Sequence, residues 1–317
     1  MYTMIFDIQI GDYRVGMIDS VEVHKSVELL ADTCKIVLPA AEYNRALDVE
    51  SQLKRGDVAV VKFGYKETGL VEEFRGYLQT ISTDDGDITL TLEDELYQLR
   101  KAIPDATLKK VSLEDLLNKV VKDAGSDLKV ESTFSWTYEK FVISKATAYD
   151  VVKKVQDECK ADIYIKDGTL HVHAAGEQIG VERFYNFSKN VEECSLTYHQ
   201  AADKKYQVVV KATMPDGTIK EMEVGSTGGD RIEIKCASAD EQSMKLRAEM
   251  ELKRRSFDGY EGSITTWLIP ECVPGDMATL HDEDYDVKDG SYFVTAVTTK
   301  FASSGGSREI ELGFRLS

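Results

Sequence analysis

The sequence predicts an α+β protein that is mainly β, with two related small β-barrel-like domains on either side of an α+β insert. Short strands separated by turns fill residues 1–104 and 186–317, as in small barrels and sandwiches. Two helical patterns and a hairpin occupy residues 105–185. A Gly-Asp-Val-Ala segment at 56–59 recurs as Gly-Asp-Met-Ala at 275–278, so we expect the outer domains to be related.

The first domain, residues 1–104, is predicted from period-two alternation. In Ile88-Thr-Leu-Thr-Leu92 every second residue is apolar, which is typical of a strand with one buried face. The preceding run Asp84-Asp-Gly-Asp87 has the composition of a turn. The expected strands are 21–24, 33–38, 58–63, 73–81 and 88–92.

The insert, residues 105–185, begins with a helix start signal. Ser112-Leu-Glu-Asp115 has the spacing of a capping box, apolar residues follow at helical spacing, and Gly125 suits a left-handed C-cap. Thr147 begins a second copy of this pattern, and Asp167-Gly168 is a hairpin turn between alternating runs. These patterns predict helices at 112–124 and 147–160 and strands at 162–166 and 169–173.

The second β domain, residues 186–317, is interrupted by one predicted helix. Ser238-Ala-Asp-Glu241 matches a capping box, and apolar residues behind it lie along one helix face, which predicts a helix at 238–253. The final run alternates strictly, so we expect it to be half buried. The expected strands are 206–211, 218–224, 263–269, 277–280, 292–298 and 309–316.

Charge and composition exclude several classes of protein. The chain has 317 residues, of which 42% are hydrophobic, the balance of a soluble globular protein. Its 39 basic and 56 acidic residues give a net charge of −17, which argues against specific binding to nucleic acid or to an anionic membrane. The five cysteines are widely spaced, which predicts neither disulfides nor zinc. We expect no signal peptide and no membrane-inserted segment.

The sequence predicts no catalytic, cofactor-binding or metal site. It contains none of the common nucleotide-binding, hydrolase or zinc-protease motifs. The glycine-rich run 225–230 precedes a strand, so we interpret it as a hairpin loop. The acidic run 282–286 lacks the later residues of a calcium loop, which leaves a solvated loop or an adventitious cation. His171 and His173 share one face of a strand, but two ligands do not make a metal site.

Three stretches of the chain resemble the phage tail baseplate hub proteins. This family comprises the late control protein D proteins and the related base of VgrG-type spikes. The first stretch runs from Arg55-Gly-Asp57 through Phe74-Arg-Gly-Tyr-Leu78, and the second is the pair of capped helices. The third joins Pro270-Glu-Cys-Val-Pro-Gly-Asp276 to Gly290-Ser-Tyr-Phe-Val294 and the Gly-rich end of the next strand. Lys300 departs from the pattern, since a His is frequent there.

The resemblance implies a non-enzymatic structural protein of the virion tail, made in the cytoplasm of a host bacterium. Such hubs are homotrimers whose two β domains per subunit form a ring with near six-fold symmetry. The ring joins a hexameric tail tube to a trimeric central spike, and tape-measure protein is a further partner. The resemblance also implies that no spike or lysozyme-like domain is fused to this chain.

Two alternatives remain at this stage. The same hub role could belong to a bacterial contractile injection system, or the chain could be a soluble cell-wall hydrolase. We further expect the acidic β segments to line a channel, because fixed negative charge repels the phosphates of passing DNA. The basic residues of 105–185 would then face outward. If the acid instead served solubility, it would spread over the outer surface.

Overall fold

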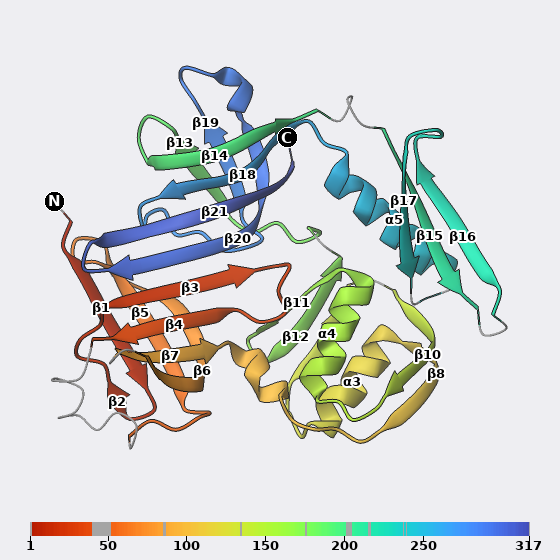
Figure 1. Cartoon of the computed structure of the whole chain (residues 1–317), viewed down its shortest axis with the longest axis horizontal. Helices are drawn as coiled ribbons and strands as arrows, with labels where there is room; N and C mark the ends of the chain where they lie inside the picture. Colours follow the sequence, from red (N-terminus) through yellow and green to blue (C-terminus); the bar gives the residue numbers. More distant parts are fainter. Residues whose placement is uncertain are drawn as a thin grey trace.

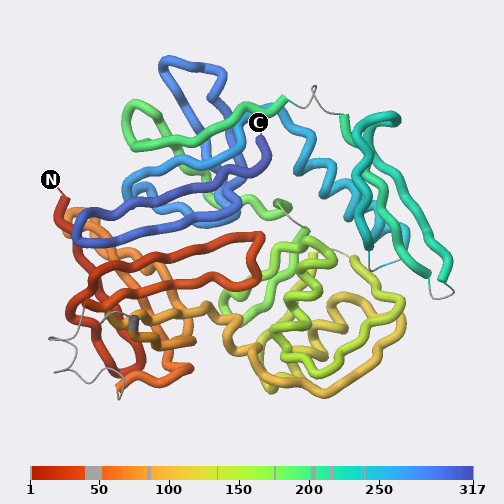
Figure 2. Tube along the Cα trace, in the orientation of Figure 1, coloured from red at the N-terminus to blue at the C-terminus, as the bar shows by residue number. Residues whose placement is uncertain are grey.

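The computed structural model describes residues 2–39, 52–84, 87–133, 135–174, 176–200, 205–214, 217–236, 238 and 240–316. Two β parts, formed by the two ends of the chain, lie against each other (Figure 1). A helical part lies beside them, and a separate three-stranded sheet projects at its far end. The trace in Figure 2 shows that the chain passes from the first β part to the helical part before it forms the second β part. The molecule is therefore mainly β, as the sequence predicts.

The first β part is an antiparallel sheet in the order β3-β4-β7-β6-β5-β1-β2. Alternation explains its buried face: in β4, Cys34, Ile36 and Leu38 are buried, and Thr33 and Lys35 are exposed. The turn predicted at 84–87 lies mostly outside the described residues. The strands are β1 (Met4–Ile10), β2 (Tyr13–Arg14), β3 (Ser20–Ser26), β4 (Thr33–Leu38), β5 (Val58–Tyr65), β6 (Gly69–Asp84) and β7 (Asp87–Glu93).

The second β part has the order β14-β18-β21-β20-β19-β13. A 3-10 helix, η2 (Asp286–Lys288), stands between β19 and β20. In β21 the alternation is strict from Arg308 to Phe314, and every second residue is buried. The strands are β13 (Glu182–Asn186), β14 (Val191–His199), β18 (Gly259–Thr266), β19 (Met277–His281), β20 (Gly290–Ala302) and β21 (Gly305–Arg315).

The two β parts follow the same pairing order. The meander β5-β6-β7 matches β19-β20-β21 in order and in antiparallel direction, and β4 and β3 correspond to β18 and β14. One direction differs, because β1 runs antiparallel to β5 whereas β13 runs parallel to β19. The order and direction predicted from the two Gly-Asp segments therefore agree over the meander. The described sheets are open, and closure into barrels stays a prediction.

One strand pair joins the two β parts into a continuous sheet. β20 pairs with β3 in antiparallel fashion over seven residue pairs, from Ala296↔Ser26 to Ala302↔Ser20. The 13-stranded sheet therefore contains strands from both ends of the chain. Phe301 on β20 also packs in the core of the first β part.

The helical part confirms the predicted caps. Ser112 accepts a hydrogen bond from the Asp115 amide at the start of α3 (Leu113–Asp123), and Gly125 has φ +61° at its end. Thr147 and Asp150 form a complete capping box at α4 (Ala148–Cys159). The remaining elements are η1 (Glu95–Leu99), β8 (Ala106–Ser112), β9 (Lys129–Ser132), β10 (Thr137–Ile143), β11 (Ala161–Lys166) and β12 (Thr169–Ala174).

Residues 205–255 differ from the expectation that they belong to the second β sheet. They form β15 (Tyr206–Thr213), β16 (Ile219–Gly225), β17 (Asp230–Cys236) and α5 (Glu241–Arg255). Val208, Val210 and Met244 lie in one hydrophobic core with α3 and α4, not with β18 to β21. The apolar faces of β15 and α5 are buried against the helical part, so these residues extend that part.

Two local predictions in this region are wrong. The helix does not begin at Ser238, because Asp240 is its N-cap and accepts from the Ser243 amide, while the Ser238 hydroxyl donates to the Thr137 carbonyl. The loop 226–229 is not a hairpin loop, because β15 lies between β16 and β17 and pairs with both. In both cases the sequence predicted a local contact, and the structure has a contact between distant segments instead.

Candidate functional site

The continuous sheet has one polar face that crosses both β parts. Six residues lie directly opposite one another across it, from Glu193 on β14 through Glu309 and Thr298 to Thr33 on β4. None of the six is buried, whereas the alternate positions on β3, β4, β18, β20 and β21 carry the core. The polar face comprises Glu22, His24, Thr33, Lys35, Glu193, Ser195, Glu261, Ser263, Thr265, Thr298, Lys300, Glu309 and Glu311.

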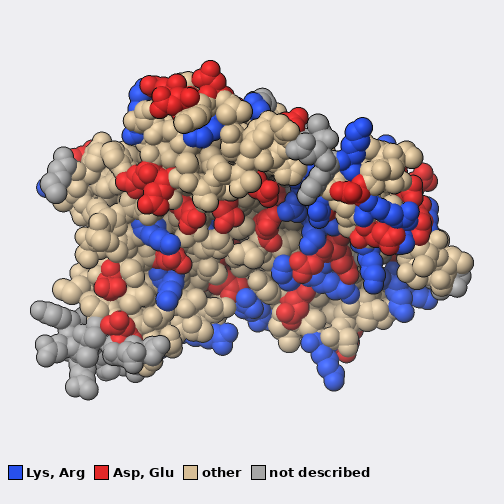
Figure 3. Space-filling view, turned by 45° about the horizontal axis from the view of Figure 1, so that its top comes forward, with Lys and Arg blue, Asp and Glu red and all other residues tan. Residues whose placement is uncertain are grey.

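The polar face is net acidic. It carries five glutamates against two lysines, which gives −3 with neutral histidine. Lys300 lies 3.9 Å from Glu22, and Ser263 donates to Glu309 at 3.2 Å, so part of this charge has local partners. Figure 3 shows acidic side chains in a band across the middle of the molecule and at its top, and acidic and basic ones intermixed toward the side sheet β15–β17.

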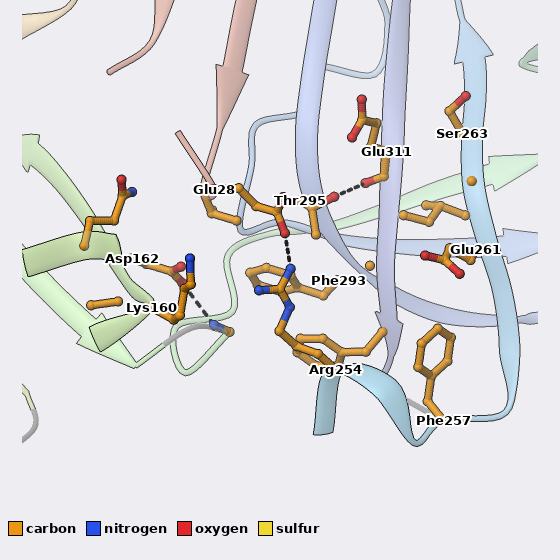
Figure 4. Close-up of a pocket in the computed structure, with 18 of the residues that line it drawn as sticks. Glu28, Lys160, Asp162, Arg254, Phe257, Glu261, Ser263, Phe293, Thr295 and Glu311 are labelled. Atoms are coloured by element: carbon orange, nitrogen blue, oxygen red, sulfur yellow. Dashed lines mark hydrogen bonds and ion pairs between the residues drawn. The ribbon is translucent and has the colours of Figure 1, made fainter. Parts of the chain in front are cut away.

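A groove of about 650 Å³ lies where the polar face meets the helical part. Its sheet side is formed by Glu261, Ser263 and Glu311, and its opposite side by α4 and the start of β11 (Figure 4). Phe293 and Phe314 stack at 5.3 Å between ring centroids and also line it.

The groove contains one ion pair that bridges two parts of the chain. Arg254, at the end of α5, pairs with Glu28 from the loop after β3 (Figure 4). The preceding residue, Lys253, places its ammonium 4.5 Å from the centre of the Phe314 ring. The last turn of α5 therefore places Arg254 in the groove and Lys253 against the Phe314 ring of its lining.

Asp162 is the groove residue with the most perturbed acidity. Burial raises its pKa to about 7, although the Gly176 amide donates to its carboxylate at 2.9 Å and Arg254 lies nearby. Desolvation disfavours the charged form more than these contacts favour it. Asp162 therefore forms part of the groove wall.

The two β parts are also locked by a buried ion pair. Arg308 on β21 is 1% exposed and donates to both carboxylate oxygens of Glu73 on β6, at 2.6 and 3.0 Å. Its remaining donors reach the Leu268 carbonyl and the Thr299 hydroxyl. Both β parts are thus held together on the core side of the same sheet that carries the polar face.

The histidines singled out by the sequence lie on one face, as predicted. The rings of His171 and His173 stack 5.7 Å apart, and Tyr164 stacks on His171 at 5.2 Å. Burial and the neighbouring His171 lower the pKa of His173. Among the described residues no group of three His, Cys, Asp or Glu side chains is placed to hold a metal ion.

The acidic run 282–286 forms the predicted loop between two strands. Asp282 accepts from the amides of Asp284 and Tyr285, and Lys288 donates to its carboxylate. The Lys288 ammonium therefore holds a position that a cation would otherwise take. Of the helices that the structure describes, none has the length and hydrophobicity of a membrane span.

Sequence reasoning missed the groove. Its residues come from separate segments, and no motif links them in the sequence. The alternation of Glu309 and Glu311 in a strand was a visible signal of an acidic face, but the partner strand was not predictable from it.

No family model and no curated protein matches this sequence. Solved structures do match in fold. The tail protein from Neisseria meningitidis aligns over 99% of this chain and 97% of its own, with a TM-score of 0.67 and 13% identity. The 43 kDa tail protein of prophage MuSo2 from Shewanella oneidensis aligns over 98% of both chains, with a TM-score of 0.66 and 14% identity.

A third match is a component of the E. coli type VI secretion system, which is described as similar in structure to bacteriophage tail proteins. It aligns over 98% of this chain and 77% of its own, with a TM-score of 0.61 and 9% identity. The chain therefore has the fold of phage tail proteins. The resemblance that the sequence motifs indicated is confirmed at the level of the fold.

Proposed function

We propose that this chain is a non-enzymatic baseplate hub of a phage or prophage tail. In this role it forms a homotrimer that joins the hexameric tail tube to the trimeric central spike, with tape-measure protein as a further partner. Its location is the virion tail, and it is made in the host cytoplasm. The likeness to tail proteins along nearly the whole chain supports this role.

The repeated strand order within one continuous sheet carries the proposal. Two β parts with the same pairing order are joined rigidly by β3–β20 and by the Arg308–Glu73 pair. Three such subunits would present six similar β units, which is what a ring needs to match a hexameric tube above and a trimeric spike below. A duplicated, rigid unit is the simplest way for three chains to make that adaptor.

The polar face would line the channel of the ring. It is rich in Ser, Thr and Glu and is net −3, so it repels phosphates within about 8 Å at physiological salt. We assign the first β domain to residues 1–104, the insert to 105–185 and the second β domain to 186–317, with 205–255 packed onto the insert. The basic residues of the insert would face away from the channel.

One further role is favoured by a specific observation. The likeness to the type VI secretion component is compatible with the same hub function in a bacterial contractile injection system. The cell-wall hydrolase alternative is disfavoured, because the solved structures that match nearly the whole chain are tail proteins.

Size-exclusion chromatography with light scattering tests the hub proposal directly. We expect a mass of three copies of the 35.5 kDa chain. Negative-stain images of that species should show a ring with a central channel. A monomer at micromolar concentration, or release of muropeptides from purified peptidoglycan by the pure protein, would contradict the proposal.

A further inference from the structure

The charged side chains on one side of the groove have partners among the residues that the structure describes, and those on the other side do not. On the α5 side, Arg254 pairs with Glu28 and Lys253 lies over the Phe314 ring. On the sheet side, Glu261 and Glu311 are exposed and make no ion pair with any described residue. The groove thus has excess negative charge on its sheet side (Figure 4).

The two unpartnered glutamates have a defined spacing. Ser263 on β18 lies directly opposite Glu311 on β21, and Glu261 is two residues from Ser263 on the same face. Glu261 and Glu311 are therefore diagonal neighbours on antiparallel strands, at about 7–8 Å between backbone positions. Two negative charges on diagonal neighbours of one sheet face repel each other, and a ligand with two cations would relieve the repulsion.

This spacing matches an extended peptide. Side chains at positions i and i+2 of an extended chain point to the same side and are about 6.6–6.8 Å apart. A groove of about 650 Å³ also falls in the range of ligand-binding pockets, about 300–1,000 Å³. Lys253 over Phe314 shows that the aromatic lining of this groove already accepts a cation.

We propose that the groove docks an extended basic segment of a partner protein, in which Lys or Arg residues two positions apart bind Glu261 and Glu311. The segment would lie along the sheet side, with its two cations on the carboxylates and its intervening side chain toward α4 and the start of β11 on the opposite side. This inference concerns one subunit and does not depend on the trimeric ring.

Fluorescence anisotropy with the full chain tests the proposal. The probe is a fluorescein-labelled, acetylated peptide Ser-Arg-Leu-Arg-Ser-Ser, compared with Ser-Glu-Leu-Glu-Ser-Ser and with an isomer in which the arginines are adjacent. We expect binding of the first probe, no binding of the acidic one, and weaker binding of the isomer. Equal binding of the two basic probes would overturn the spacing argument.

Two double variants separate local binding from general charge. Glu261→Gln with Glu311→Gln should weaken binding of the first probe by about 5- to 25-fold, since each exposed charge pair contributes up to about fivefold. Glu283→Gln with Asp284→Asn removes the same two charges from the loop 282–286, outside the groove, and should leave the affinity unchanged. Equal loss in both variants would overturn the proposal.

Two further outcomes identify a different occupant. If spermidine displaces the probe at the same concentration as the unlabelled peptide, the groove is a site for small cations and not for a peptide. If Glu261→Gln with Glu311→Gln changes the oligomeric state, a second copy of the chain occupies the groove. Either result overturns the partner-segment proposal, and neither bears on the hub fold. Unchanged thermal melting confirms that the variants are folded.

Discussion

Removal of one partner from the buried Arg308–Glu73 pair should destabilise the chain more than any surface substitution. Arg308 is 1% exposed, and its guanidinium donates to Glu73, Leu268 and Thr299. In Glu73→Gln the guanidinium would lose its counter-charge while it remains desolvated. Breaking a buried pair in this way costs about 3–5 kcal/mol of unfolding free energy.

The double variant Glu73→Leu with Arg308→Met gives the matched comparison. Replacing a buried ion pair with apolar groups of similar volume is often neutral or stabilising, because the desolvation cost disappears along with the attraction. We therefore expect the double variant to recover most of the stability that Glu73→Gln loses. The coupling between the two positions is then measured by a double-mutant cycle.

Urea denaturation followed by tryptophan fluorescence and by circular dichroism is the assay. Trp267 lies just after β18 and reports on the second β part once the other tryptophan, Trp136 in the core of the helical part, is replaced in a Trp136→Phe background used for every variant. If the pair locks the two β parts, the two signals coincide in the wild type and separate in Glu73→Gln. A loss below about 1 kcal/mol in Glu73→Gln, or a double variant no more stable than that single one, would refute the reasoning.

Two further predictions concern stability. Thr147→Ala removes the hydroxyl that caps α4 and should lower the unfolding free energy by about 1 kcal/mol, measured by urea denaturation. The control is Lys153→Ala, which changes a partly exposed residue on the same helix. Equal losses of stability in the two variants would contradict a capping role for Thr147. Burial raises the pKa of Asp162 to about 7 from an ordinary value of about 3.9, so the folded state retains a proton that the unfolded chain releases. Stability should therefore fall as the pH rises from about 4 to about 7, and Asp162→Asn should flatten part of that fall. An unchanged pH profile in Asp162→Asn would show that the carboxyl titrates normally.

Helix caps, tight turns and strand alternation could be predicted from the sequence because each depends on interactions between residues close together in the chain. Ser112 and Thr147 cap helices through hydrogen bonds to residues three positions away. Asp167 and Gly168 adopt φ of +50° and +72°, which suits the tight turn between β11 and β12. Alternation over a few residues sufficed to place most strands, since the side-chain period of a strand is two.

The start of α5 shows where local reasoning stopped. The spacing from Ser238 to Glu241 predicts a cap at Ser238. The tertiary structure chose Asp240, because the Ser238 hydroxyl is taken by the Thr137 carbonyl 101 positions away. The side sheet β15–β17 is a similar case, since the core it joins is formed by α3 and α4.

What the sequence alone determined is the three helices, most of the strands, the acidic character and the hint of a repeat in the two Gly-Asp segments. The strands β1, β2, β8 to β10, β13 and β14 were not predicted. Only the tertiary structure decided that β3 pairs with β20, that Arg308 reaches Glu73 across 235 positions, and that Glu261 and Glu311 face one groove. The physical reason is that each of these depends on which strand lies next to which. Strand neighbours are selected by burial summed over the whole core, whereas caps and alternation are settled within a few residues.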